Sequence, residues 1–345
     1  MSRKRAGCPK RVLNGPCGGM KPDGMCELGD ARCVFADKQP SEIILDPGFR
    51  FRPKLEKRKP FTKLLSKVWS EAVWVAEVPP SFEAAEKIQL LKGLSFSALS
   101  VPDNPLATLH LESSAFAAYL KKALGCEVIV HLTCRDLNRL ALKSRLLALQ
   151  LSGIEHVLAL TGDYPSIRSE ARSTSIFDLD SIRLIYLARI MSDHGTDELG
   201  NPISRKLRLQ VGAGLNPYLP IEVEFSRALR KIMAGAEFFV TQLVFNIEQA
   251  EALLKALKKA GITTPIFIGF LLASGEWAQK VLKAIGVPAI ELPTSLETIT
   301  ESYIEILRKL RKLYGPVGAF ISTLGRLENL KVWDEAFRSL SQPTS

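Results

Sequence analysis

Four of the six cysteines lie close together near the start of the chain, at Cys8, Cys17, Cys26 and Cys33. Eight, eight and six residues separate successive members, which is not the C-x-x-C spacing of common zinc ribbons or ferredoxins. In a cytosolic protein such a cluster indicates metal binding rather than disulfides. Two ligands stay open: a 4Fe–4S cluster that passes electrons, and a zinc ion that is purely structural. Four unligated thiols are the remaining alternative.

Polar side chains also interrupt apolar segments farther along the chain. Glu77 closes the run AVWVAEV, and Asp163 follows the run EHVLALT. A carboxylate at such a position is costly unless it is paired or takes part in chemistry. Gln242 lies inside EFFVTQLVF, and its amide could bind a heteroaromatic ring because it both donates and accepts hydrogen bonds. Each side chain alone could make a structural contact, but the three together predict a polar site.

Eight short apolar segments, each with the character of a strand, alternate with stretches of helical spacing. They are residues 72–78, 96–101, 127–133, 155–161, 207–213, 237–245, 265–271 and 317–323. Strands that alternate with helices indicate a parallel sheet, and near-continuous apolar strands indicate burial on both faces. A count of eight favours an α/β fold of the (β/α)8 TIM barrel type. A Rossmann sheet is the alternative, but no strand is followed by a G-x-G-x-x-G turn.

This pattern predicts three parts of the chain. Residues 1–36 form a small cysteine-rich metal-binding module, residues 37–60 form a linker, and residues 61–345 form the barrel. In such barrels the chemistry lies at the carboxyl ends of the strands, so the polar residues above should meet at one mouth. His131 ends another strand, where it is either a satisfied core side chain or part of the site. Glycines such as Gly162 would let the backbone approach a ligand, and helix starts nearby could bind phosphate.

The composition narrows the classes of partner. The 345 residues carry a net charge of +10, which attracts anions such as a polyanionic small molecule. No apolar run is long enough to span a bilayer, and the basic residues are not interleaved with aromatics along one stripe. We therefore expect no membrane and no nucleic-acid partner. The basic first residues are not followed by an apolar stretch, which predicts no signal peptide and a cytoplasmic protein.

The ordered strand ends resemble those of methylenetetrahydrofolate reductases, which are flavin-bearing (β/α)8 barrels. The similar segments occur in the family's order over roughly residues 70–326 and are AEVPPS, HLTCRD, ALTGDYP, VGAGLNP, RKIMAGAEFFVTQLVFN and STLGR. No single segment is specific, but the ordered set is. The resemblance implies flavin-dependent reduction of 5,10-methylenetetrahydrofolate, or of an archaeal pterin analogue, to the 5-methyl form.

The resemblance also implies roles for individual residues. Glu77 matches the acid that protonates the pterin nitrogen and opens the methylene bridge, and Asp163 matches the acid beside the pterin and the flavin. Gln242 matches the glutamine that binds the folate, Arg326 an arginine near the substrate, and Trp277 is the nearest candidate for the covering aromatic. The positions that match flavin contacts, for FAD or FMN, are His131, Thr161, Gly162, Asp163, Gly214, Leu215, Asn216, Arg230 and Lys231.

Two departures from the family pattern stand out. The chain has VAEVPP where the family often has FEFFPP, and Thr161 stands where the family often has an arginine. These differences leave the hydride donor open between NADH, NADPH and a ferredoxin-type protein. The chain is similar to the family's barrels, which commonly form homo-oligomers, so we expect one here.

The first cysteines resemble a second family feature. Residues 14–19, NGPCGG, match the signature of a small cysteine-rich domain that accompanies such reductases in some anaerobes and archaea. Here it would be a short fused version. Two other functions stay open from the sequence: a pterin-binding methyltransferase of the same fold, and a non-catalytic metal module that docks to a separate reductase.

Overall fold

The strands of the computed structural model, which describes residues 7–29, 31–165, 173–284 and 295–340, close into one parallel barrel in chain order. They are β1 (Trp74–Glu77), β2 (Ala98–Val101), β3 (Glu127–Thr133), β4 (His156–Leu160), β5 (Gln210–Leu215), β6 (Phe238–Leu243), β7 (Ile266–Leu271) and β8 (Val317–Ser322). The closure pairs β1 with β8, Val75 lying opposite Phe320. The eight predicted segments and the barrel are confirmed, and the open Rossmann sheet is wrong.

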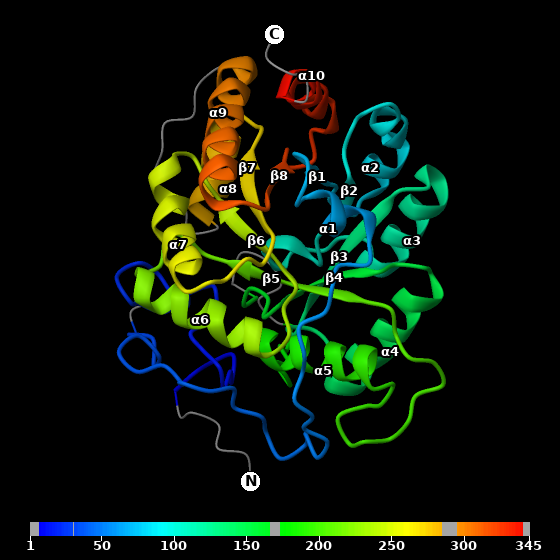
Figure 1. Cartoon of the computed structure of the whole chain (residues 1–345), viewed down its shortest axis with the longest axis vertical. Coiled ribbons are helices and arrows are strands. Elements are labelled where there is room, and N and C mark those ends of the chain that lie inside the picture. The colour runs from blue at the N-terminus through cyan, green and yellow to red at the C-terminus, as the bar shows by residue number, and fades with distance from the viewer. Residues whose placement is uncertain (1–6, 30, 166–172, 285–294, 341–345) are drawn as a thin grey trace.

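Helices surround the barrel on its outer side (Figure 1), except that α1 packs against residues of its interior. They are α1 (Lys63–Lys67), α2 (Phe82–Glu86), α3 (Ser113–Leu124), α4 (Arg139–Leu151), α5 (Ser181–Asp193), α6 (Ile221–Met233), α7 (Ile247–Lys259), α8 (Glu276–Ala284), α9 (Leu296–Tyr314) and α10 (Leu330–Leu340), with 3-10 turns η1 (Ile88–Leu91), η2 (Pro105–Ala107) and η3 (Leu327–Asn329). Side-chain caps begin several of them: Asn138 accepts a hydrogen bond from the backbone N–H of Ala141 at the start of α4.

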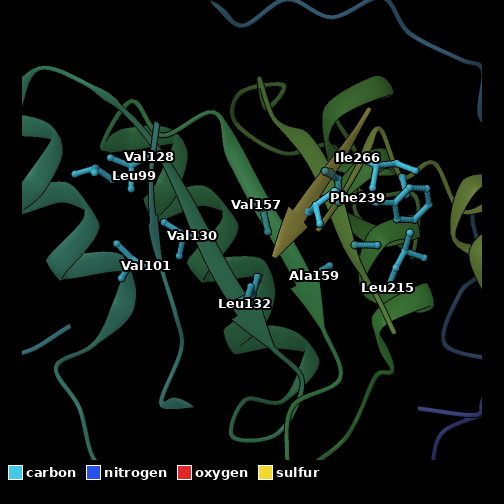
Figure 2. Packing of buried hydrophobic residues seen from close by; sticks show 14 of the residues in the cluster. Leu99, Val101, Val128, Val130, Leu132, Val157, Ala159, Leu215, Phe239 and Ile266 are labelled. Atoms are coloured by element: carbon cyan, nitrogen blue, oxygen red, sulfur yellow. The ribbon is translucent and has the colours of Figure 1, made fainter. Parts of the chain in front are cut away.

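Each strand buries both of its faces, which explains its apolar sequence. On β3, Val128 and Val130 pack outward against the helices, in the cluster that Figure 2 shows, whereas Ile129 packs into the barrel interior. This alternation follows from the two-residue period of a strand. Because both layers are apolar at this level, the strand reads as a nearly continuous hydrophobic run.

The amino-terminal end of the barrel is closed by α1. Leu64 and Leu65 are fully buried against the interior residues of the strands. The Glu127 carboxylate of β3 accepts hydrogen bonds from the backbone N–H groups of Lys63 (3.0 Å) and Leu64 (2.9 Å), which satisfies free donors at the start of this helix. Access to the interior is therefore left at the carboxyl ends of the strands.

The described part of the predicted module, residues 7–29 and 31–36, has no helix and no named strand; its one isolated bridge pairs Met25 with Arg32. The stretch 37–60 is also irregular and runs along the barrel beside α5 and α6 (Figure 1). Arg58 ties it down through ion pairs with Glu237 and Asp193. The division at residues 36 and 60 stays a prediction. Residues 1–6 of the predicted module and residues 341–345 of the predicted barrel part lie outside the described residues.

Among the residues the structure describes, no helix is long and apolar enough to cross a membrane. The expected cytoplasmic location is not tested by this observation and stays a prediction.

Candidate active site at the mouth of the barrel

A cavity of about 620 Å³ opens at the carboxyl ends of the strands. Its wall includes inward-facing residues of β1, β3, β4, β5, β6 and β8, together with three residues from the cysteine-rich segment. This volume is in the range of cavities that hold a cofactor or a drug-sized ligand. The place agrees with where (β/α)8 barrels carry their chemistry.

Glu77 points into this cavity from the end of β1. One of its carboxylate oxygens, Oε1, accepts a hydrogen bond from the hydroxyl of Ser322 on β8 (2.6 Å). Burial raises the pKa of Glu77 above its ordinary value, and the Ser322 bond opposes that rise without cancelling it. The described residues give Glu77 no cationic partner. Its surroundings therefore favour a protonated carboxyl, which is the form that can donate a proton.

His131 also lines the cavity, from the end of β3. Its Nε2 lies 2.9 Å from the hydroxyl of Ser100 on β2, and its ring faces Phe320 at a centroid distance of 6.2 Å. Burial lowers the pKa of His131 to about 3. The imidazole is therefore neutral near pH 7, and it serves this wall as a neutral hydrogen-bonding surface rather than as a proton donor.

The turn after β4 brings Thr161, Gly162 and Asp163 to the cavity. Gly162 has a φ of +91°, and a side chain there would meet the Cβ of Arg135 at 3.0 Å, so this position requires glycine. Thr161 is buried, and its hydroxyl accepts from the backbone N–H of Ser181 (3.3 Å). The Asp163 side chain is exposed toward the mouth.

Gln242 reaches the cavity because β6 is irregular. The pairing of β6 with β7 shifts register between Val240 and Leu243. Within this shift the hydroxyl of Thr241 accepts from the backbone N–H of Gly269 (2.9 Å), and Gln242 Oε1 accepts from that of Leu243 (3.0 Å). The described residues offer no hydrogen-bond partner to Gln242 Nε2, so this donor is free for a ligand.

Helix α6 adds positive charge to the wall through Arg227 and Lys231, which are one turn apart. Arg227 pairs with Glu224, whereas Lys231 donates to the backbone oxygen of Gly214 and has no ion-pair partner among the described residues. Burial, reinforced by Arg227, lowers the pKa of Lys231 to about 7. An anionic group in the cavity would stabilise the charged form of this lysine.

The loop after β5 completes this side of the cavity with Gly214, Leu215 and Asn216. Asn216 is fixed on two sides. Its backbone N–H donates to the Glu224 carboxylate (2.9 Å), and its Nδ2 donates to the backbone oxygen of Gly18 (3.2 Å). The predicted residues of this loop are therefore brought together with those of β1, β3 and β4, although their role toward a cofactor stays a prediction.

Two predicted residues are absent from the described lining of the cavity. The Arg230 guanidinium points to the cysteine-rich segment instead, where it donates to the backbone oxygens of Gly15 (3.1 Å) and Pro40 (2.5 Å). Arg326 is exposed, with its guanidinium 5.6 Å from the ring centroid of Trp277, which does line the cavity. The placement of Arg230 does not fit the predicted contact with flavin phosphates.

Some lining residues were missed from the sequence. The loop after β2 contributes Asp103 and Leu106, and it contains non-glycine residues with positive φ, among them Asn104 (42°) and Leu106 (57°). Such strain is frequent at functional sites. Asp103 holds the loop against β3 by accepting from the backbone N–H (3.0 Å) and hydroxyl (2.8 Å) of Thr133. The segment Val101–Asn104 carries a Pro-Asp-Asn run that could have indicated this turn.

The four clustered cysteines are half-buried and lie near one another. Burial is the largest cause of the raised pKa of the Cys8 thiol, and negative charge on Cys17 and Cys26 adds to the rise. Even so, no group of three or more His, Cys, Asp or Glu side chains in the described residues has an arrangement that could hold a metal ion. The expected metal-binding character of the module is therefore not supported by this arrangement.

Two family models match parts of this chain. The family model for methylenetetrahydrofolate reductase matches residues 81–306, well over half of the chain, and one described as methylene-tetrahydrofolate reductase C terminal matches residues 4–41. Among solved structures, that of a mutant tryptophan synthase α-subunit from Pyrococcus furiosus aligns with 78% of this chain and with 97% of the α-subunit, at 11% sequence identity. The TM-score of this alignment is 0.45, which is too low to carry an argument.

Curated relatives give the same family. The chain is 27% identical over 57% of its length to a probable methylenetetrahydrofolate reductase (NADPH) of Caenorhabditis elegans, and 26% identical over 57% to a probable methylenetetrahydrofolate reductase (NADH) of Oryza sativa. It covers 30% and 33% of those two proteins, so it spans about a third of their length. Because the family model matches more than half of its residues, this chain belongs to the methylenetetrahydrofolate reductase family.

Proposed function

We propose that this protein reduces 5,10-methylenetetrahydrofolate, or an archaeal pterin analogue, to the 5-methyl form with a bound flavin. The observation that carries the proposal is the carboxyl of Glu77, buried at the end of β1 in a cavity of cofactor size, with its pKa raised by burial. Family membership supports the same reaction, because a methylene bridge must be opened by an acid before its carbon can accept hydride.

Glu77 would supply the proton. The Ser322 hydroxyl occupies its Oε1, which leaves Oε2 as the oxygen that can carry a proton toward the cavity. A carboxyl whose pKa is raised by burial keeps this proton at a pH where an exposed glutamate has lost it. Transfer of the proton to N10, the bridge nitrogen outside the pterin ring, breaks the bond between N10 and the methylene carbon. The carbon then stays on the pterin nitrogen N5 as an electrophilic iminium that can accept hydride.

Two polar residues would hold the pterin. Gln242 presents a free Nε2 donor, and the exposed Asp163 carboxylate accepts hydrogen bonds from ring N–H groups at the same mouth. Trp277 offers an aromatic face at the rim, next to Arg326. Binding by these groups would orient the methylene carbon and keep the substrate in register with Glu77.

The cavity fits a flavin by its size and donor set. Gly162 and Gly214 leave backbone exposed to the cavity, and Lys231 is a buried cation without an ion-pair partner among the described residues, suited to a phosphate. His131 adds a neutral polar wall. FAD or FMN, when reduced, supplies the hydride in this reaction. Which of the two is bound, and whether NAD(P)H or a ferredoxin-type protein reduces it, is part of the proposal to be tested.

We also propose that Cys8, Cys17, Cys26 and Cys33 bind a 4Fe–4S cluster or zinc. Burial and the charge of neighbouring thiolates raise the pKa of Cys8 and Cys33, and a bound cation would relieve that repulsion. The described side chains would have to move to form the site. Iron and zinc assays on freshly purified protein decide this point. A homo-oligomeric state and a cytoplasmic location are further expectations.

The test of the proposed function uses protein purified without oxygen. After reconstitution with FAD or FMN, the absorbance spectrum should contain a bound flavin, and chemically reduced protein should convert 5,10-methylenetetrahydrofolate to 5-methyltetrahydrofolate, measured by chromatography. Tetrahydromethanopterin derivatives are assayed in parallel. Failure to retain either flavin, or flavin binding without turnover of any of these pterins, would contradict the proposal.

A further inference from the structure

The cysteine-rich segment reaches into the cavity through one lysine. Lys10 is only 3% exposed, although it is a cation, and it belongs to the wall of the cavity. Its Nζ donates to the backbone oxygen of Gly162 (2.7 Å) and forms an ion pair with Glu27 of the same segment. An ammonium group has three N–H donors, so one donor remains after these two contacts.

The chain after Lys10 is fixed to the barrel by buried hydrogen bonds. Asp180, the N-cap of α5, accepts from the backbone N–H groups of Leu13 (3.0 Å) and Asn14 (3.2 Å). Arg230 holds the next residue, Gly15, through its backbone oxygen (3.1 Å). These contacts join the segment to two separate helices, α5 and α6, and hold the backbone that follows Lys10 against the barrel.

The glycines of residues 14–19 serve the same arrangement. A side chain at Gly19 would come within 1.9 Å of the Glu27 carboxylate, and it would displace the partner of Lys10. Gly18 accepts a hydrogen bond from Asn216 (3.2 Å), so the segment also contacts the loop after β5. The glycines at residues 18 and 19 thus leave room for Glu27 beside Lys10 and for contact with the loop after β5.

We propose that Lys10 is a positioning residue that the cysteine-rich segment supplies to the flavin site of the barrel. It holds the Gly162 carbonyl, and thereby the turn that carries Asp163, and it directs positive charge into the cavity while Glu27 lies behind it. A charge with so little exposure is weakly screened. It favours an anionic cofactor, and it favours the more negative of the flavin's two redox states. The inference rests on the proposed function.

The test measures the affinity for FAD and FMN by fluorescence titration, and the midpoint potential of the bound flavin. Lys10→Met and Lys10→Gln should each bind flavin about 10-fold to 100-fold more weakly, as expected for loss of a hydrogen-bonded buried charge. Both should shift the potential to more negative values. Lys10→Arg keeps the charge and should restore most of the affinity. The matched control is Lys21→Met, an exposed lysine of the same segment.

Equal affinity and potential in Lys10→Gln and the wild-type protein would overturn the inference. So would equal losses in Lys10→Met and Lys21→Met, because these would indicate a general effect of changing the segment. If Lys10→Met does not fold, as judged by thermal unfolding, Lys10→Gln decides, since it keeps a donor to Gly162. Wild-type protein that binds neither flavin would instead contradict the proposed function itself, and the two failures are therefore distinct.

Discussion

Two layers of side chains inside the barrel differ by only two positions along each strand. In the lower layer Val75, Ile129 and Phe320 belong to one apolar cluster with the buried leucines of α1, and the Phe320 ring also lines the base of the cavity. In the upper layer the residues two positions later are Glu77, His131 and Ser322, and these line the cavity. The same strands therefore stabilise the barrel at one level and carry polar groups at the next. A substitution should affect stability or chemistry according to its layer.

The largest effect is expected at Glu77. Glu77→Gln keeps the shape and the contact with Ser322 but removes the proton donor, so the turnover rate should fall by about 10²–10⁴-fold. The free energy of unfolding should not fall, because a buried ionisable group is replaced by a neutral one. Steady-state formation of the methylated pterin and denaturant unfolding measure the two quantities. A variant that loses stability and activity together would break the distinction between the layers.

In the lower layer, at Phe267, we expect the opposite result: a loss of stability with little change in flavin binding. This ring is fully buried and packs edge-to-face on Phe238 at 6.1 Å. Phe267→Ala should lower the free energy of unfolding by about 3–5 kcal/mol, through lost burial and the cavity left behind. Flavin affinity should change little at a temperature where the variant is folded. Urea denaturation gives the first quantity, and a flavin affinity that falls as much as in Lys231→Met would contradict the assignment.

A smaller effect, and one that depends on pH, is expected at Lys231. Its pKa is lowered to about 7 by burial, so it loses its charge as the pH rises through that value. The affinity for FAD should therefore weaken above neutral pH, and Lys231→Met should bind FAD about 10-fold more weakly at pH 6 and without this pH dependence. Fluorescence titration across a pH series measures it. An unchanged pH profile in Lys231→Met would assign the dependence to another group.

The smallest expected effect is the pH dependence that Glu77 gives to the free energy of unfolding. Because the folded-state pKa of Glu77 is raised, its protonated form stabilises the fold fully below the pKa of the unfolded chain, and this contribution is lost as the pH rises through the folded-state pKa. Glu77→Gln should therefore flatten the decrease in unfolding free energy over that window. Denaturation at several pH values tests this. Parallel curves for the two proteins would indicate that Glu77 is ionised in the folded state.

The sequence predicted the barrel well because each strand is buried on two faces and therefore has an apolar run that is easy to detect. It also predicted several cavity residues, since chemistry in this fold lies at strand ends. It could not show which side of α6 faces the cavity. Arg227 and Lys231, four residues apart, share that side, whereas Arg230 points to the cysteine-rich segment. A helical-spacing argument from Lys231 could have found Arg227.

The docking of the cysteine-rich segment was beyond prediction from sequence for a physical reason. Its position depends on long-range contacts, such as Asp180 with Leu13 and Asn14, that have no local periodicity. The same reason hid Lys10, whose functional neighbour Gly162 lies 152 residues away. Residues 14–19 resemble the signature of a small cysteine-rich domain, yet their glycines also make room for contacts within the segment and to the barrel.

The most direct test of this account is the rate at which 5,10-methylenetetrahydrofolate oxidises the reduced, flavin-loaded protein, followed by flavin absorbance in a stopped-flow instrument over a pH series. We predict a rate constant that falls as the pH rises through the raised pKa of Glu77, and a much lower, pH-independent rate constant in Glu77→Gln. Equal rate constants in the two proteins at every pH would contradict the assignment of Glu77 as the acid.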